Sequence, residues 1–215
     1  MAQSRTKDMT QGPILPLIVK FSLPLLMGNL FQQTYNLVDT AIVGQTLGAK
    51  ALAAVGSSTS IQFLVMGFCI GMSLGFSIPV GQRFGAKDYS GMHRYEYAGG
   101  ILAALFAALV TLLTTVFCNH ILHLLQVPEE IFHDAWVYLI IIFCEIPFTV
   151  MYNYLAGLMR AIGDSKTPFI YLAVASVLKI GLDFLFIVNV AMGVAGAALA
   201  TVLSQALLAL LCLYA

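Results

Sequence analysis

Six long apolar segments, separated by short polar stretches, follow one another along the 215-residue chain. A helix that crosses the hydrocarbon core of a bilayer needs about 20 residues, and each segment is close to that length. The pattern therefore predicts six transmembrane helices, at about residues 14–38, 51–76, 97–118, 135–158, 168–189 and 193–214. We expect an all-α polytopic membrane protein, with a cytoplasmic tail at residues 1–12 and one six-helix lobe at residues 13–215.

The composition supports this class. Hydrophobic residues make up 60% of the chain and charged residues 9%, whereas a soluble domain carries about 25% charged residues. Basic and acidic side chains number ten each, so the net charge is zero and gives no reason to expect a nucleic-acid partner. The four cysteines lack the spacing of a disulfide framework or a zinc site, and we expect no metal site.

Basic residues predict the orientation in the membrane. If the amino terminus is cytoplasmic, the outer side carries only Lys50, and the inner side collects seven basic residues: Arg5, Lys7, Arg83, Lys87, Arg94, Arg160 and Lys166. Cytoplasmic loops are enriched in Lys and Arg. We therefore expect a multi-pass protein of the plasma membrane with a cytoplasmic amino terminus.

The first apolar segment contains polar side chains in its second half. Residues three or four apart share a helix face. Five residues at these spacings are expected to form one stripe: Asn29, Gln32, Gln33, Asn36 and Asp39. A carboxylate near the bilayer centre costs about 3 kcal/mol on the translocon scale. The stripe should thus face other helices or a water-filled cavity, as a functional site or as a polar cluster that only fixes helix packing.

Proline and glycine residues in the first two predicted helices indicate how these helices bend and pack. Pro24 removes a backbone hydrogen bond and clashes with the preceding turn, so we expect a kink there and a hinge between two helix arrangements. In the second helix, Gly67, Gly71 and Gly75 recur every four residues, which predicts that a neighbouring helix packs closely against this face.

The fifth predicted helix contains a second charged group. Ser176, Lys179 and Asp183 lie three and four residues apart and share a face. Lys179 and Asp183 are expected to neutralise one another, either as a functional pair or only to compensate charge inside the membrane.

The fourth and sixth predicted helices add further polar positions. Glu145, Thr149, Tyr152 and Asn153 form a polar stripe on the fourth, where Glu145 is expected to be paired or protonated. Two roles stay open for Glu145: a hydrogen bond that stabilises helix packing, and a position in a proton pathway. The sixth helix places Ala197, Thr201 and Gln205 on one face.

These groups suit a cation-coupled cavity. The chain has no catalytic triad, phosphate-binding glycine loop or metal-ligand cluster, so we expect no enzyme and no cofactor beyond a coupling ion. Asp39 and Asp183 are expected to differ in proton affinity, because burial and a nearby ammonium act on a carboxyl in opposite directions. Proton binding would then shift the first helix between two arrangements.

Four stretches carry a resemblance to a known family, and they follow the family's order along most of the chain. They are Pro24 with Tyr35–Gly44, Ala51–Gly56, Gly81–Asp88, and Gly157–Pro168. Together they resemble the amino-terminal half of a transporter of the multidrug and toxic compound extrusion (MATE) family.

This resemblance implies two six-helix lobes that export organic cations or other amphipathic drugs, driven by inward flow of protons or sodium ions. Its amino-terminal cation site would fall on Asp39, Asp183 and Thr201. Many members carry asparagine where this chain has Lys179, and a fixed ammonium competes with sodium for the carboxylate, which favours protons. We expect the cavity to be lined by Gln32, Gln33, Tyr35, Asn36, Asn153 and Gln205.

Only one lobe is expected in this sequence, which ends inside an apolar segment. A shortened sequence or a split gene is the simplest explanation, and parallel pairing of two copies is the alternative. Three other functions stay open. A lipid-linked oligosaccharide flippase of the same superfamily would be expected to have a more basic cavity, a proton channel would need a continuous hydrated path, and a non-transporting membrane scaffold would use Asp39 only in assembly.

Overall fold

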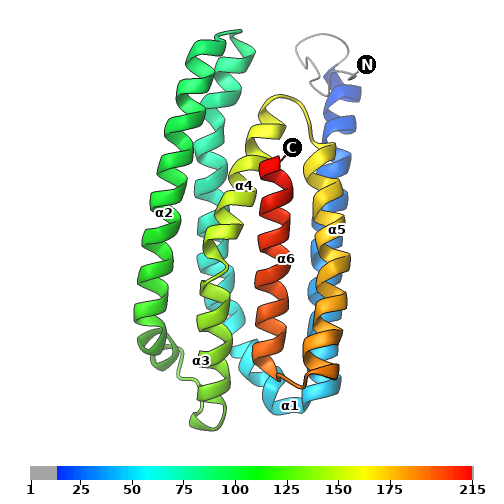
Figure 1. The fold of residues 1–215 in the computed structure, drawn as a ribbon, viewed down its shortest axis with the longest axis vertical. Coiled ribbons are helices and arrows are strands. Elements are labelled where there is room, and N and C mark those ends of the chain that lie inside the picture. Colours follow the sequence, from blue (N-terminus) through cyan, green and yellow to red (C-terminus); the bar gives the residue numbers. More distant parts are fainter. Residues whose placement is uncertain (1–13, 215) are drawn as a thin grey trace.

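The computed structural model describes residues 14–214, and the predicted tail at residues 1–12 lies outside them. The described residues form helices joined by short turns, in an elongated bundle (Figure 1). In chain order the elements are α1 (Ile14–Gly85), α2 (Tyr89–Leu124), α3 (Glu129–Phe143), α4 (Ile146–Ala161), α5 (Lys166–Asp183), the π-helix η1 (Phe184–Asn189) and α6 (Val194–Tyr214).

Helix α1 contains two of the six predicted helices. Its 72 residues are interrupted at Gly48, whose φ of 81° and ψ of −175° are not helical. A positive φ is easily adopted by glycine because it has no Cβ. The first limb, residues 14–47, descends on the right in Figure 1, and the second limb, residues 49–85, rises toward the upper left. Among residues 14–214, five continuous helical runs are long and apolar enough to span a membrane, and the first of them folds back at Gly48. The predicted all-α membrane fold is confirmed, although the two first helices are continuous except at Gly48.

The helices are longer than predicted at both ends of the bundle: α2, for example, runs from Tyr89 to Leu124 where residues 97–118 were predicted. The second limb of α1 continues to Gly85 and α2 begins at Tyr89. Arg83 and Arg94, expected in a loop, therefore lie on helices, and the turn between them is only residues 86–88. The hydrophobic pattern marks the apolar part of a helix alone, whereas a helix with polar side chains can continue into the headgroup layer.

The predicted helix at 135–158 is divided into α3 and α4. At the break, the N–H of Cys144 donates to the carbonyl oxygens of both Ile140 and Ile141, and that of Glu145 donates to Ile142 at 2.9 Å. Pro147, in the first turn of α4, has no N–H to continue the helical ladder. A tight turn therefore places Glu145 between two helices inside the bundle.

The largest core lies where α2, α3 and α4 meet the second limb of α1. Phe143, Leu139 and Ile146 are completely buried in it. Small residues of α2 allow the close packing: a Cβ added at Gly99 would lie 2.8 Å from the Tyr154 hydroxyl oxygen. That hydroxyl donates to the carbonyl oxygen of Glu96 at 2.6 Å.

The glycine ladder of the second limb does not pack as predicted. A Cβ added at Gly67, Gly71 or Gly75 would meet nothing within 4 Å, and all three residues are exposed in residues 14–214. The close approach occurs instead at Gly157 of α4, where an added Cβ would lie 2.6 Å from the Ser77 hydroxyl oxygen. Glycine spacing permits close packing, but it does not determine which face has a neighbour.

The first limb of α1 packs against α5, which also contacts α6. Near one end of this contact, the ring of Phe31 lies 5.9 Å from that of Phe169. Near the other, Val43 and Ala197 belong to one buried cluster with Ile187 of η1. The polar residues between these apolar contacts form the candidate site.

Candidate cation-coupling site

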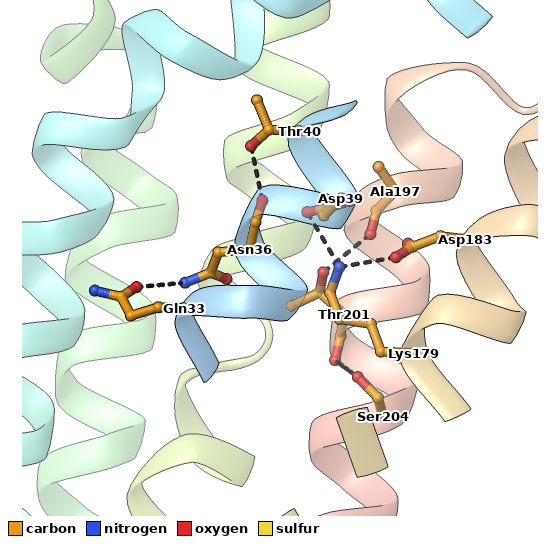
Figure 2. Close-up of polar contacts among 9 residues, drawn as sticks. All are labelled: Gln33, Asn36, Asp39, Thr40, Lys179, Asp183, Ala197, Thr201 and Ser204. Carbon is orange, nitrogen blue, oxygen red and sulfur yellow. Dashed lines mark hydrogen bonds and ion pairs between the residues drawn. The ribbon is translucent and has the colours of Figure 1, made fainter. Parts of the chain in front are cut away.

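A buried ammonium lies between two carboxylates from different helices. Lys179 Nζ of α5 is 3.1 Å from Asp39 Oδ2 of α1 and 3.0 Å from Asp183 Oδ2 (Figure 2). The exposed fractions of the three side chains are 3% for Lys179, 16% for Asp39 and 1% for Asp183. We call these three residues the lysine cluster. The contact between Lys179 and Asp183 agrees with their four-residue spacing, and the contact with Asp39 joins α5 to α1.

Local helix geometry accounts for this arrangement. Lys179 and Asp183 are one helical turn apart on α5, so they face the same neighbour. One turn before Asp39 on α1, the ring of Tyr35 is centred 5.4 Å from Lys179 Nζ, within the range of a cation–π contact. Two ion pairs and an aromatic face thus offset the cost of burying the ammonium. With all three groups charged, the cluster has a formal charge of −1.

Each carboxyl of the lysine cluster keeps one free oxygen. Asp39 Oδ1 and Asp183 Oδ1 are buried and have no hydrogen-bond partner among residues 14–214. Buried polar atoms without partners are uncommon in native structures, because their desolvation is not compensated. These two oxygens are therefore positions where a proton or a cationic ligand would be stabilised.

Thr201 and Gln205 of α6 do not bond to the cluster. The Thr201 hydroxyl donates to the carbonyl oxygen of Ala197 at 3.0 Å, along its own helix (Figure 2). Ser204 donates to the Thr201 carbonyl oxygen at 2.8 Å. Gln205 is half-buried, and its side-chain oxygen has no partner in the described part of the chain. Their predicted roles in cation and substrate binding stay predictions.

The polar stripe predicted on the first helix divides between two faces. Tyr35 is buried and Gln32 half-buried, on the same side as Asp39. Asn29, Gln33 and Asn36 are exposed on the other side, where the Asn36 amide donates to Gln33 Oε1 at 3.4 Å. Neighbouring residues on a helix differ by about 100° in direction. A stripe with both Gln32 and Gln33 is therefore too wide to face one neighbour.

The remaining predicted positions lie apart from the lysine cluster. Asn153 of α4 is half-buried, and its amide donates to the Thr149 carbonyl oxygen at 2.8 Å. Pro24 lies inside the first limb of α1, and Gly48 is the residue of α1 with non-helical dihedral angles. The helix is thus not interrupted at Pro24 in this structure, and its role as a hinge stays a prediction.

Two features near the cluster were missed by the sequence analysis. Tyr138 of α3 is 4% exposed and close enough to Asp39 and Asp183 for electrostatic interaction. The π-helix η1 begins directly after Asp183. Such segments are rare and often occur at functional sites. A buried tyrosine resembles any other apolar residue in a hydrophobic pattern, and the sequence contains no recognised signal for a π-helix.

A separate hollow lies at the end of the bundle near Gly48. It has a volume of about 330 Å³, and its lining includes Leu47, His133 and Gly193. None of the lysine cluster residues lines it. We therefore assign the polar chemistry to the cluster rather than to this hollow.

Comparison with known proteins agrees with this architecture. Probable multidrug resistance protein YpnP of Bacillus subtilis (strain 168) is 38% identical over 205 residues, which are 92% of this chain and 44% of that protein. Multidrug export protein MepA of Staphylococcus aureus (strain COL) is 28% identical over 203 residues, or 93% of this chain and 44% of that protein. The chain thus spans less than half the length of these relatives.

Solved structures show the same fold. A solved structure described as the outward-facing conformation of a multidrug resistance MATE family transporter of the MOP superfamily superposes with a TM-score of 0.90 at 27% identity. The match covers 97% of this chain and 47% of that one. The family model MatE matches residues 24–185, which include Asp39, Lys179 and Asp183. This chain belongs to the MatE family.

Proposed function

We propose that this chain is one lobe of a multidrug efflux antiporter, and that protons rather than sodium ions drive it. The observation that carries the proposal is the position of Lys179, whose ammonium lies 3.1 and 3.0 Å from the carboxylates of Asp39 and Asp183. The ammonium fills the space between two carboxylates that a sodium ion would otherwise occupy.

Electrostatics favour the proton as coupling ion. A sodium ion bound to the same carboxylates would lie close to the ammonium of Lys179. Two like charges 4 Å apart repel by about 4 kcal/mol at an effective dielectric constant of 20. A proton avoids this repulsion, because it binds covalently to one oxygen and neutralises that carboxylate. Asp39 Oδ1 and Asp183 Oδ1 have no partner in residues 14–214 and are suited to receive it.

Protonation would also alter the contact between α1 and α5. A neutral Asp39 attracts the Lys179 ammonium less strongly than a charged one, so the ion pair that joins the two helices would weaken. The first limb of α1 would then be released to bend at Pro24, where a helical hydrogen bond is missing. Proton binding would thereby shift the lobe between two arrangements.

The proposed substrates are organic cations or other amphipathic drugs. With one ammonium and two carboxylates, the lysine cluster has a formal charge of −1 and would attract a cationic drug. On α1, Gln32 is half-buried on the same side as Asp39, and Gln33 and Asn36 offer amide groups on the exposed face. A lipid-linked oligosaccharide flippase would be expected to have a more basic site than this one.

A second six-helix lobe is proposed as the partner. The exposed face of the first limb is polar at Asn29, Gln33 and Asn36, which suits a water-filled cavity between lobes better than lipid. The exposed glycine ladder on the second limb, centred on Gly71, would let another helix approach closely. The relatives named above are about twice as long as this chain. The second lobe is either a carboxyl-terminal half or a second copy.

The orientation is proposed from the ends of the bundle. The start of α1 and the end of α6 both lie toward the upper end in Figure 1. The turn at residues 86–88 and the turn before α5 join helices at this end, where Lys87 and Lys166 lie. Lys50 lies at the opposite end, just after Gly48. Since basic residues are enriched on the cytoplasmic side, the upper end would face the cytoplasm of a cell with this protein in its plasma membrane.

Transport into proteoliposomes tests this proposal. The assembled transporter, meaning this lobe together with its second lobe, is given a fluorescent cationic drug and either an imposed proton gradient or an imposed sodium gradient. We expect drug movement with the proton gradient and none with the sodium gradient. Movement driven by sodium at equal pH on both sides would overturn the choice of ion, and no movement with either gradient would overturn antiport.

A further inference from the structure

A third acidic residue is buried in the membrane part of the lobe, at the break between α3 and α4. Glu145 is 5% exposed and follows the last turn of α3. The residues beside this turn, Phe143 and Ile146, are completely buried in the main apolar core. The tight turn thus carries the Glu145 carboxyl into the interior.

The hydrogen bonds of this carboxyl are incomplete. Glu145 Oε1 accepts a hydrogen bond of 2.8 Å from the Thr149 hydroxyl, one turn along α4. Glu145 Oε2 is buried and has no partner in the described residues. No lysine, arginine or histidine within 4 Å pairs with Glu145 in residues 14–214, whereas Asp39 and Asp183 both contact Lys179. An unpaired charge in such surroundings is costly, and a carboxyl there is stable when it carries a proton.

Buried titratable groups on three other elements lie in the region of this carboxyl. They are Tyr35 on α1, Tyr138 on α3 and Lys179 on α5, each close enough to interact with Glu145 electrostatically. Lys179 is already engaged by two carboxylates. Both tyrosines are buried, and the ring of Tyr35 is centred 5.4 Å from Lys179 Nζ.

We propose that Glu145 is a second proton-binding site of this lobe, separate from the lysine cluster. This inference rests on the proposed proton-coupled function. Glu145 holds one proton as a neutral acid in the arrangement described here. When the lobe changes shape and water reaches the α3–α4 break, the acid releases that proton and becomes a carboxylate. The lobe therefore binds and releases protons at two places.

Infrared spectroscopy of the intact protein in lipid nanodiscs tests the proton directly. The described glutamates other than Glu145 lie at the surface: Glu96, Glu129 and Glu130. Carbon-13 labelling of the glutamate side chains shifts the C=O stretch of a protonated glutamic acid and leaves aspartic acids unchanged. We expect a label-sensitive carboxylic acid band at neutral pH that is absent from Glu145→Gln.

Two further variants keep the test decisive. Glu130→Gln changes an exposed glutamate that faces Lys50 at 4.0 Å, and it should leave the band unchanged. Thr149→Val removes the donor to Glu145 Oε1 but keeps the carboxyl, so the band should persist at a higher frequency, because its C=O loses a hydrogen bond. If Glu145→Gln does not accumulate, the label shift in the natural protein and the frequency change in Thr149→Val decide the question. A wild-type spectrum without a label-sensitive carboxylic acid band would overturn the proposal.

Proton counting separates this inference from the proposed function. A pH-sensitive dye reports the protons released when a cationic drug binds to the intact protein in weakly buffered solution. We expect release from the wild type and about half as much from Glu145→Gln, with drug binding retained. Equal release from both proteins would overturn the role of Glu145 and leave proton coupling intact. No release from the wild type would instead overturn proton coupling itself.

Discussion

The aspartates in the turns of this lobe and the aspartates inside its membrane part differ in how fully their oxygens are bonded. Asp88, before α2, uses both oxygens. Its Oδ1 accepts from the Gly91 N–H at 2.9 Å and the Ser90 hydroxyl at 3.0 Å, and its Oδ2 pairs with Arg83 at 3.1 Å. This carboxylate caps the first turn of α2.

Asp164, before α5, is bonded in the same way. Its Oδ1 accepts from the N–H groups of Lys166 and Thr167 at 3.1 and 3.0 Å, and its Oδ2 accepts from the Thr167 hydroxyl at 2.6 Å. Both turn aspartates thus stabilise helix ends.

In the membrane part, Asp39 and Asp183 share the ammonium of Lys179 and each keep a buried oxygen without a partner in residues 14–214. An aspartate that only stabilises structure gains from satisfying every acceptor. An aspartate that must bind and release a proton gains from a vacant one. The difference separates carboxylates that hold the fold from carboxylates that we propose take part in transport.

The strongest test of this contrast is Asp39→Asn in the assembled transporter. The amide keeps the size of the side chain but cannot be ionised, so we expect drug efflux to be lost while the amount of folded protein stays near normal. Efflux and membrane insertion are measured in the same cells. Normal efflux by well-expressed Asp39→Asn would remove Asp39 from the mechanism.

Lys179→Ala should have the next largest effect, because it leaves two neighbouring carboxylates without their cation. Breaking a buried pair in this way typically costs about 3–5 kcal/mol. Proton uptake by Asp39 or Asp183 relieves much of that cost, so the variant should be more thermally stable at low pH than at high pH, with a shifted pH optimum of transport. Thermal unfolding and efflux are measured across pH. A stability and a pH optimum equal to those of the wild type would show that the ion pairs do not form.

Pro24→Ala tests whether the first limb of α1, which carries Asp39, bends during transport. Alanine supplies the missing N–H to the first limb of α1 and should straighten it. We expect slower transport with unchanged or slightly raised thermal stability, since the limb that carries Asp39 would bend less readily. An unchanged transport rate at equal expression would remove the hinge from the mechanism.

The turn aspartates should give the smallest effects. Asp164→Ala removes three hydrogen bonds at the start of α5 and should lower the stability by about 1 kcal/mol without altering the pH optimum of transport. Thermal unfolding and efflux are measured together. Loss of transport in a stably folded Asp164→Ala protein would contradict the division between the two groups of aspartates.

The stability that Asp88 contributes to the fold should depend on pH. Hydrogen bonds from the Gly91 N–H and the Ser90 hydroxyl, together with the Arg83 guanidinium, hold the pKa of Asp88 below its ordinary value. Its contribution to stability is thus present above the pKa of the unfolded chain, about 3.9, and is lost as the pH falls through the lower folded value. The thermal stability of Asp88→Asn should therefore differ least from that of the wild type in strong acid.

The sequence was sufficient to predict the apolar segments that form the membrane part of the bundle, because a helix that spans a bilayer needs a long apolar segment. It was also sufficient for the contact between Lys179 and Asp183, which follows from helix periodicity alone. Both predictions depend on the local chain and not on its neighbours.

Features that depend on neighbouring helices were harder to predict. The stripe from Asn29 to Asp39 divides between two faces because α5 covers only one of them. The glycine ladder at Gly71 has no neighbour among residues 14–214, although its spacing is suited to one. The break before Glu145 and the π-helix after Asp183 have no periodic signal. Periodicity shows which residues share a face, whereas packing determines what that face contacts.

Sodium dependence of Lys179→Asn is the most direct test of the central claim, that the ammonium of Lys179 occupies the cation position. Drug efflux by the assembled wild type and the variant is measured across pH, with and without sodium, at matched membrane insertion. Asparagine restores the residue found in many family members and removes the competing charge. We expect a wild type that responds to pH but not to sodium, and a variant that gains a sodium response and has a shifted pH profile. Identical pH and sodium profiles in both proteins would contradict the claim.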